Sequence, residues 1–325
     1  MRFAVIGAGA IGAYVGASLA RAGADVTLVA RGDHLAAMQR DGVTVLSPRG
    51  NFRALPRAVG RLADVGAVDV VLLALKAHQI AAVADELRTL LAPATTVVAM
   101  QNGLPWWYFF RHGGRYDGMQ LESVDPGGRI GAAIDPRTTV GCVIYCSALL
   151  EAAGVVRHSE GTRFSLGEPD RSLSDRARAI AAAFAAAGLK APVEVDIRRE
   201  IWLKLLGNAA LNPISALSRA TLAEMCDDPL VEPLIAEMMR EALAVAATLG
   251  IVLETSIERR IDGARRVGAH KTSMLQDLET RKPLELDALL GAIVELGRIT
   301  GTPTPASRHV FALGKLLERS ALAGR

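Results

Sequence analysis

The stretch Arg2-Phe-Ala-Val-Ile-Gly-Ala-Gly-Ala-Ile-Gly12, close to the start of the chain, decides the fold. Its first five residues form an apolar run that predicts a short buried β-strand, and the small residues from 13 to 23 predict a helix. The glycines between them follow the spacing G-x-G-x-x-G at a strand–turn–helix junction. In that setting Gly7 allows the tight turn, Gly9 lets the backbone approach a pyrophosphate, and Gly12 lets the helix pack closely on the strand. The stretch therefore predicts a dinucleotide-binding unit.

The beginning of this helix is the expected phosphate site. Its first N–H groups have no partner within the helix, and the helix dipole adds a partial positive charge there. The alternative is a glycine-rich turn without a ligand, in a chain that has 31 glycines. The residues of this turn that are predicted to bind the cofactor are Gly7, Gly9, Ala10, Ile11 and Gly12.

The end of the second predicted strand, Asp25-Val-Thr-Leu-Val-Ala30, indicates which dinucleotide is bound. NAD sites usually have an acidic residue there, which binds the ribose 2′-hydroxyl. This chain has Arg31 after Ala30, and a guanidinium can bind a 2′-phosphate in bidentate fashion. We therefore expect NADP (NADPH) rather than NAD, the alternative being a solvated arginine and a mild preference.

Two further buried strands end in polar residues. The run Val68–Leu75 is followed by Lys76, and the run Thr95–Met100 is followed by Gln101-Asn102-Gly103. Ligands of open α/β sheets bind beyond the carboxyl ends of the strands. Lys76 and Asn102 are therefore predicted cofactor contacts, although Lys76 could also be a solvated loop residue.

The pattern changes near residue 197. The first part alternates helices and strands, whereas from Ile197 onward apolar residues recur at helical spacing and no strand is expected. The predicted fold is α/β then all-α: a Rossmann-type dinucleotide-binding domain over residues 1–196 and a helical substrate and catalytic domain over residues 197–325. Further elements expected in the first domain are helices over 34–41, 78–91 and 171–188, and strands over 43–46, 52–58, 138–146, 154–158, 163–167 and 192–196.

Composition limits the function classes. A net charge of +3 in 325 residues, without charged tails, favours neither a nucleic acid nor a membrane surface as partner. The three cysteines do not make a disulfide framework, and Cys142 and Cys146 lie on one face of a predicted strand as core residues. No metal site, signal peptide or membrane span is expected, and a cytoplasmic location fits these features.

The segment Glu200–Pro213 predicts a mostly apolar helix with one polar stripe. Lys204, Asn208 and Asn212 are four residues apart and share a helix face. A cation and two amides in apolar surroundings are unfavourable unless they are paired, so the stripe suggests a site for a small polar ligand. The alternative is a lysine that reaches past apolar surface to water, with two locally satisfied amides.

Five consecutive aromatic residues, Trp106 to Phe110, follow Asn102 after a short loop. Such a block could line or cover a substrate pocket. It could equally be a helix that packs against the second domain or a partner subunit, which is the interpretation we favour.

The chain resembles the ketopantoate reductase (2-dehydropantoate 2-reductase) family over nearly its whole length. Besides the glycine pattern, the motifs that carry the resemblance are Leu75-Lys-Ala77, Gln101-Asn-Gly103, Lys204 with Asn208, Asn212 and Pro213, Ser273-Met-Leu-Gln-Asp277 and Glu285-x-Asp287. The resemblance implies NADPH-dependent reduction of a 2-oxo acid, with 2-dehydropantoate giving pantoate in pantothenate biosynthesis. The segment after Gln101-Asn-Gly103 is longer and more aromatic here than the family pattern.

The resemblance also implies residue roles. Arg31 and Lys76 would lie near the 2′-phosphate, and Asn102 near the nicotinamide and the reacting centre. Lys204 would be the catalytic general acid and Glu285 the active-site glutamate, whose alternative is a surface residue in a helix start after Pro283. The residues expected to bind substrate are Asn102, Lys204, Asn208, Asn212 and Ser273, the last of which could instead be a helix N-cap.

Two other functions stay open at this point. The aromatic block would suit a reductase of a different branched or bulkier 2-oxo acid, and an NADPH-binding sensor without turnover needs no acid group. The apolar C-terminal helices leave room for a homodimer without establishing one.

Overall fold

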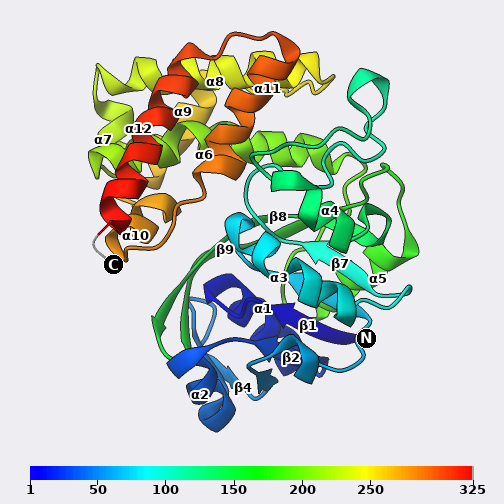
Figure 1. The fold of residues 1–325 in the computed structure, drawn as a ribbon. Helices are drawn as coiled ribbons and strands as arrows, with labels where there is room; N and C mark the ends of the chain where they lie inside the picture. The colour runs from blue at the N-terminus through cyan, green and yellow to red at the C-terminus, as the bar shows by residue number, and fades with distance from the viewer. Residues whose placement is uncertain (324–325) are drawn as a thin grey trace. The chain divides into compact units, whose positions relative to one another are not determined.

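The computed structural model describes residues 1–323, which divide by their internal contacts into two compact units. The first unit consists of Met1–Gln101, Trp106–Gln120 and Gly127–Ile197. The second consists of two short excursions, Asn102–Pro105 and Leu121–Pro126, and the chain from Arg198 onward. Figure 1 shows the strands in the blue-to-green part of the chain and the helical unit from yellow-green to red.

A nine-stranded sheet with the order β4-β3-β9-β8-β7-β6-β1-β2-β5 forms the first unit. Strands β5, β2, β1, β6, β7 and β8 are mutually parallel, and their chain order across the sheet is the 3-2-1-4-5-6 order of a Rossmann fold. The strands are β1 (Arg2–Ile6), β2 (Asp25–Val29), β3 (Val43–Leu46), β4 (Phe52–Ala54), β5 (Arg57–Val59), β6 (Val70–Leu73), β7 (Thr96–Ala99), β8 (Thr139–Ala152) and β9 (Val155–Gly167).

Burial explains the central strands. Val5, Leu28, Leu72, Val98 and Val140 are all fully buried, as the near-continuous apolar runs of a parallel sheet covered on both faces require. Cys142 is buried in the same hydrophobic cluster, as expected of a core residue, and the partly buried Cys146 packs against the cluster.

Helices connect these strands and cover the sheet. They are α1 (Ala10–Arg21), α2 (Gly32–Asp41), α3 (Ala77–Leu90), α4 (Arg129–Ala133) and α5 (Asp175–Ala186). The start of α5 is set by Ser174, whose hydroxyl accepts a hydrogen bond from the N–H of Ala177.

Three strand predictions need correction. The segment 52–58 is two strands, β4 and β5, because Leu55-Pro56 interrupts it and proline offers no N–H to a ladder. The segments 154–158 and 163–167 are one continuous strand, β9, which pairs with β8 across several register shifts. The segment 192–196 is not a strand; it has a single bridge, between Val193 and Leu166.

The second unit consists of helices within the part of the chain that the structure describes. They are α6 (Ile197–Ser218), α7 (Leu222–Asp227), α8 (Val231–Thr248), α9 (Ile257–Val267), α10 (Ser273–Glu279), α11 (Ala292–Thr300) and α12 (Pro305–Leu322), with a π-helix over Asp287–Gly291. Helix α8 packs against α7, α9, α11 and α12 and is the centre of the unit. The predicted fold class, α/β followed by all-α, is confirmed.

Two carboxylates, the buried Glu241 and the half-buried Glu295, hold separate segments together in this unit. Glu241 of α8 accepts hydrogen bonds from the N–H groups of Ala306 (2.7 Å) and Ser307 (2.8 Å), at the start of α12. Glu295 of α11 accepts from the N–H groups of Glu122 and Ser123, both at 2.9 Å. The predicted division at residue 196 did not foresee that the excursion Leu121–Pro126 would belong to the helical unit.

The aromatic block is buried in the first unit. Trp106–Phe109 have at most 8% of their surface exposed, and Trp107 packs on β8 so closely that a Cβ on Gly141 would lie 2.6 Å from its ring. The segment forms turns, so the expected helix is wrong. Its rings pack inside the first unit, and packing against the second domain or a partner subunit stays a prediction.

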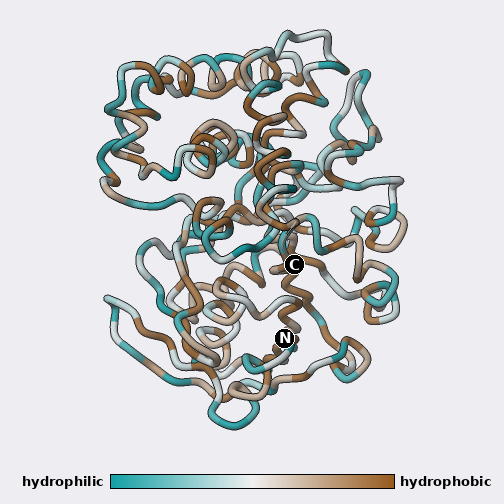
Figure 2. Tube along the Cα trace, turned by 60° about the vertical axis from the view of Figure 1, so that its left-hand side comes forward, coloured by the Kyte–Doolittle hydropathy of each residue, from teal (hydrophilic) through white to brown (hydrophobic). Residues whose placement is uncertain are grey.

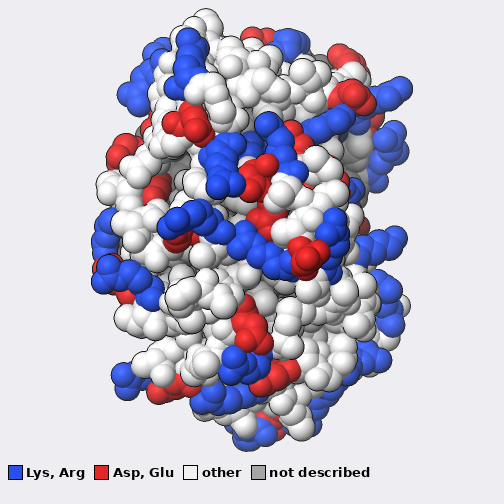
Figure 3. All heavy atoms as spheres, turned by 90° about the vertical axis from the view of Figure 1, so that its right-hand side faces the viewer, with Lys and Arg blue, Asp and Glu red and all other residues white. Residues whose placement is uncertain are grey.

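The surface carries mixed charge, and hydropathy follows the elements. Figure 2 shows hydrophobic and hydrophilic stretches interleaved along the trace, as elements with one buried face require. On the face drawn in Figure 3, basic and acidic side chains lie among one another. None of the described helices has the length and apolarity needed to cross a membrane.

Candidate active site

The glycine-rich turn has the shape of a phosphate cradle. Gly7 has φ +93°, and a Cβ on it would lie 2.7 Å from Leu75 Cδ2, so the turn passes close to the end of β6. A Cβ on Gly12 would lie 2.3 Å from the carbonyl oxygen of Gly7, which explains why the helix needs a glycine in its first turn. Gly9, the N-cap of α1, faces open space and offers no side-chain cap. The first N–H groups of α1, at Ala10 and beyond, are therefore available to an anion.

The two predicted 2′-phosphate ligands both sit at helix starts in this unit. Arg31 is the N-cap of α2 and is exposed, and within residues 1–323 its guanidinium forms no salt bridge. Lys76 is the N-cap of α3 and is half-buried; its N–H donates to Oε1 of Gln79 at 3.2 Å. Both residues follow carboxyl ends of parallel strands, β2 and β6, as the sequence predicted.

Helix α6 presents the polar stripe of the second unit. Lys204 and Asn208 are half-buried, and Asn212 is 6% exposed. Neither amide forms a side-chain hydrogen bond to another residue of the described chain. The alternative of two locally satisfied amides is therefore wrong, and two amides with unused hydrogen-bonding capacity lie one and two turns beyond the lysine.

The loop after β7 supplies a partner for that lysine. Lys204 Nζ donates a hydrogen bond to Oδ1 of Asn102 at 2.7 Å. The loop is fixed in the second unit because the N–H of Leu104 donates to the carbonyl of Ala288 at 2.9 Å. A Cβ on Gly103, which has φ +82°, would lie 2.1 Å from that same carbonyl oxygen, so only glycine permits this approach.

Glu285 lies in the segment just before the π-helix that contains Ala288. It is only 8% exposed, so the surface alternative is wrong. A single turn of π-helix is rare and occurs mostly at functional sites. The backbone at Ala288 thus holds the loop that contains Asn102, through Gly103 and Leu104. Glu285 belongs to the same short stretch of backbone.

A cluster that the sequence analysis missed holds the Glu285 segment on α12. Glu318 Oε1 accepts the N–H of Leu284 at 2.8 Å, and Lys315 Nζ bridges Glu318 (3.0 Å) and Asp287 (2.9 Å). These two carboxylates raise the pKa of Lys315 against the lowering effect of its burial. Lys315 and Glu318 are one helical turn apart, which is a common surface spacing, so no specific signal marks them in the sequence.

Ser273 lies at the beginning of α10 and is exposed. The N-cap of this helix is Thr272, whose hydroxyl accepts the N–H of Leu275, so the N-cap alternative for Ser273 is wrong by one residue. The Ser273 hydroxyl forms no hydrogen bond within residues 1–323, and no described contact joins it to Lys204.

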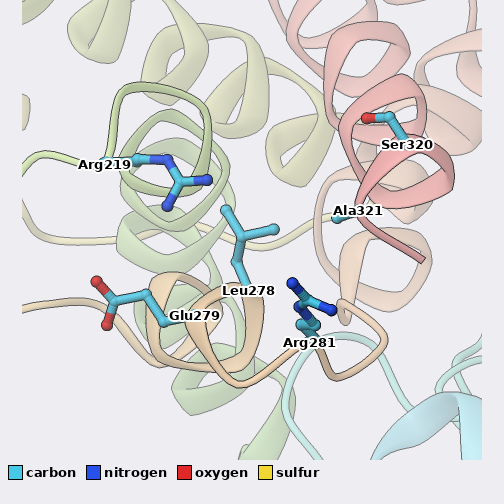
Figure 4. Close-up of a pocket in the computed structure, with 6 residues that line it drawn as sticks. All are labelled: Arg219, Leu278, Glu279, Arg281, Ser320 and Ala321. Atoms are coloured by element: carbon cyan, nitrogen blue, oxygen red, sulfur yellow. The ribbon is translucent and has the colours of Figure 1, made fainter. Parts of the chain in front are cut away.

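A cavity of about 460 Å³ opens at the other end of α10. Figure 4 shows its lining residues. One of them, Glu279, forms an ion pair with Lys271 at 2.6 Å. The cavity is lined by Arg219, Leu278, Glu279, Arg281, Ser320 and Ala321. None of the predicted site residues is among them.

Known proteins match the chain over nearly its full length. The ketopantoate reductase PanE/ApbA model matches residues 3–106, and the model of that family's C-terminal part matches residues 196–318. A 2-dehydropantoate 2-reductase of Mesorhizobium japonicum is 47% identical over 98% of both chains. A solved structure from Ralstonia solanacearum MolK2 is 40% identical with a TM-score of 0.93, covering 98% of each chain. A PanE/ApbA family ketopantoate reductase from Ralstonia eutropha JMP134 is 27% identical with a TM-score of 0.86, covering 99% of each.

The fold, the open turn at Gly9 and these matches define a nicotinamide-dinucleotide-dependent oxidoreductase. Within that class the chain belongs to the ketopantoate reductase family. The expected resemblance is confirmed.

Proposed function

We propose that this protein reduces 2-dehydropantoate (ketopantoate) to pantoate with NADPH, the reaction named for its relative from Mesorhizobium japonicum, in pantothenate biosynthesis. One observation carries the proposal beyond family membership. Lys204 is held by Asn102 at 2.7 Å, on the helix face where the side chains of Asn208 and Asn212 form no hydrogen bond to any residue from 1 to 323. A polar 2-oxo acid supplies the groups that these side chains lack.

NADPH fits the residues of the first unit. The open space at Gly9 and the free N–H groups at the start of α1 suit a pyrophosphate, and Ala10, Ile11 and Gly12 belong to the same turn. The exposed guanidinium of Arg31 suits a 2′-phosphate, with Lys76 as second cation. When bound, the cofactor supplies the hydride that reduces the carbonyl carbon.

Lys204 is the proposed general acid. Its ammonium stabilises the negative charge that develops on the carbonyl oxygen and then transfers a proton to that oxygen. Asn102 fixes the position of Nζ before substrate arrives, and the buried carboxylate of Glu285 would orient the bound substrate or the amine. Asn102, Asn208, Asn212 and Ser273 would bind the carboxylate and hydroxyl of the substrate, so that one face of the carbonyl is presented.

The test is a panel of 2-oxo acids in which the loss of NADPH absorbance is followed. We expect 2-dehydropantoate to have the highest kcat/KM and Lys204→Ala to lose about 10²–10⁴-fold in kcat with NADPH binding retained. No turnover with any 2-oxo acid despite tight NADPH binding would favour a sensor. A higher kcat/KM for a bulkier 2-oxo acid would assign another substrate.

The aromatic block was the observation in favour of a bulkier substrate, and its position in the structure removes that support. The aromatic block Trp106–Phe109 is buried against β8 in the first unit, with Trp107 1% exposed, and is part of its core. A homodimer and a cytoplasmic location stay predictions; size-exclusion chromatography with light scattering would test the first, and fractionation of cells the second.

A further inference from the structure

His34 of α2 joins three segments of the first unit. Its Nε2 lies 2.8 Å from the carbonyl oxygen of Ala8, inside the glycine-rich turn. Its Nδ1 lies 2.9 Å from the backbone N of Gly154, in the turn between β8 and β9. Segments more than a hundred residues apart in sequence are thus connected by one half-buried imidazole.

The two partners determine the protonation state of the ring. A carbonyl oxygen can only accept, so Nε2 must carry a proton; a backbone N–H can only donate, so Nδ1 must be bare. His34 is therefore neutral, with its proton on Nε2. Protonating Nδ1 would replace the hydrogen bond from Gly154 with a repulsion between two donors.

Both backbone partners are themselves fixed. Ala8 is 2% exposed, and its N–H donates to the carbonyl of Val29 at 2.9 Å. Gly154 is buried, and its carbonyl accepts the N–H of Thr44 at 2.9 Å. A Cβ on Gly154 would lie 3.1 Å from Ala37 Cβ of α2, so the hairpin turn rests directly on the helix that carries His34.

The glycine-rich turn has few other side-chain restraints. Gly7 and Gly9 carry no side chains, and α1 begins without a side-chain cap. Among the described residues, the Nε2–H of His34 is the side-chain hydrogen-bond donor to the carbonyl of Ala8, in the turn where a pyrophosphate is expected.

We propose that His34 is a positioning residue for the cofactor: its neutral imidazole fixes the glycine-rich turn in the conformation that receives the pyrophosphate of NADPH. This inference rests on the proposed NADPH-binding function. His34 acts on the cofactor indirectly, through the Ala8 peptide.

The charged surroundings of His34 are sparse. On α2 and at its start the charged residues are Arg31, Asp33 and the mutually paired Arg40 and Asp41, and the nearby hairpin carries the paired Glu151 and Arg157. The glycine-rich turn has none. Burial lowers the pKa of His34, against the raising effect of its bond to the Ala8 carbonyl. The neutral form therefore persists below the usual histidine range, and the hydrogen bond from Gly154 is lost only in more acidic solution.

The experiment compares the dissociation constant for NADPH, measured by fluorescence, in the wild type, His34→Leu and His34→Gln. Leucine fills the space but makes neither bond, and we expect about tenfold weaker NADPH binding. Glutamine has one donor and one acceptor, so it should stay within about threefold of the wild type. His309→Leu, a change at an exposed histidine of α12, is the matched control and should leave binding unchanged.

The pH dependence of NADPH binding separates a positioning role of His34 from simple destabilisation of the fold. The wild type should lose NADPH affinity relative to His34→Gln as the pH falls below about 6.5 towards the lowered pKa of His34. Equal NADPH binding by wild type and His34→Leu, or the same loss in the leucine and glutamine variants, would overturn the inference. If the wild type itself fails to bind NADPH, the proposed function is wrong, which is a distinct result.

Discussion

The hydrogen bond between Lys204 and Asn102 allows a double-mutant cycle on the proposed acid. Lys204→Met removes the ammonium but keeps an apolar side chain of similar length. Asn102→Ala removes the acceptor that lies 2.7 Å from Nζ. If Asn102 acts by holding the ammonium, its substitution should matter little once Lys204 is gone.

The expected magnitudes follow from the geometry. Loss of a positioned acid should reduce kcat by about 10²–10⁴-fold. A hydrogen bond to a charged group contributes about 1.5–3 kcal/mol, and since Lys204 is half-buried we expect the lower part of this range, or about 10- to 30-fold for Asn102→Ala. The double variant should be within about threefold of Lys204→Met, which corresponds to a coupling of about 1–2 kcal/mol.

The assay is steady-state reduction of 2-dehydropantoate, with NADPH binding measured separately. Lys190→Met, at an exposed lysine of the first unit, is the control and should behave as the wild type. If the two losses multiply in the double variant, Asn102 does not act by holding the ammonium. If Lys204→Met retains more than a tenth of the activity, Lys204 is not the acid.

Three further substitutions test other parts of the structure. Arg31→Ala should raise KM for NADPH by about 10-fold or more and leave KM for NADH nearly unchanged, because only NADPH offers a 2′-phosphate to the guanidinium; equal effects on both cofactors would contradict the assignment. Glu241→Leu should lower the free energy of unfolding in urea by about 2–4 kcal/mol, since it leaves two N–H groups at the start of α12 unpaired, while Glu241→Gln should lose less. Glu318→Ala frees the N–H of Leu284 beside Glu285 and should lower kcat about 3- to 10-fold without changing NADPH affinity, whereas unchanged kcat would show that the cluster does not position Glu285.

The fold could be predicted from local sequence to a large extent. Apolar runs such as Val68–Leu75 admit only a buried strand, and the pattern of glycines after Ile6 identifies the turn that follows. Errors occurred where pairing is decided by distant partners: residues 192–196 look like a strand but find only one bridge, and β9 continues through Gly161 because β8 runs beside it. A strand exists only when its neighbour does, and short-range propensity cannot supply the neighbour.

The candidate site likewise combines features that local spacing predicts with contacts between distant segments. Residues four apart share a face in any helix, so the alignment of Lys204, Asn208 and Asn212 follows from local spacing alone. Three other features follow from the packing of distant segments: Asn102 holds the lysine from a hundred residues earlier, Glu285 is buried, and His34 connects the glycine-rich turn to the β8–β9 hairpin. The physical reason is that covalent geometry fixes neighbours within a few residues, whereas contacts across long loops depend on how whole elements pack, which no local pattern encodes.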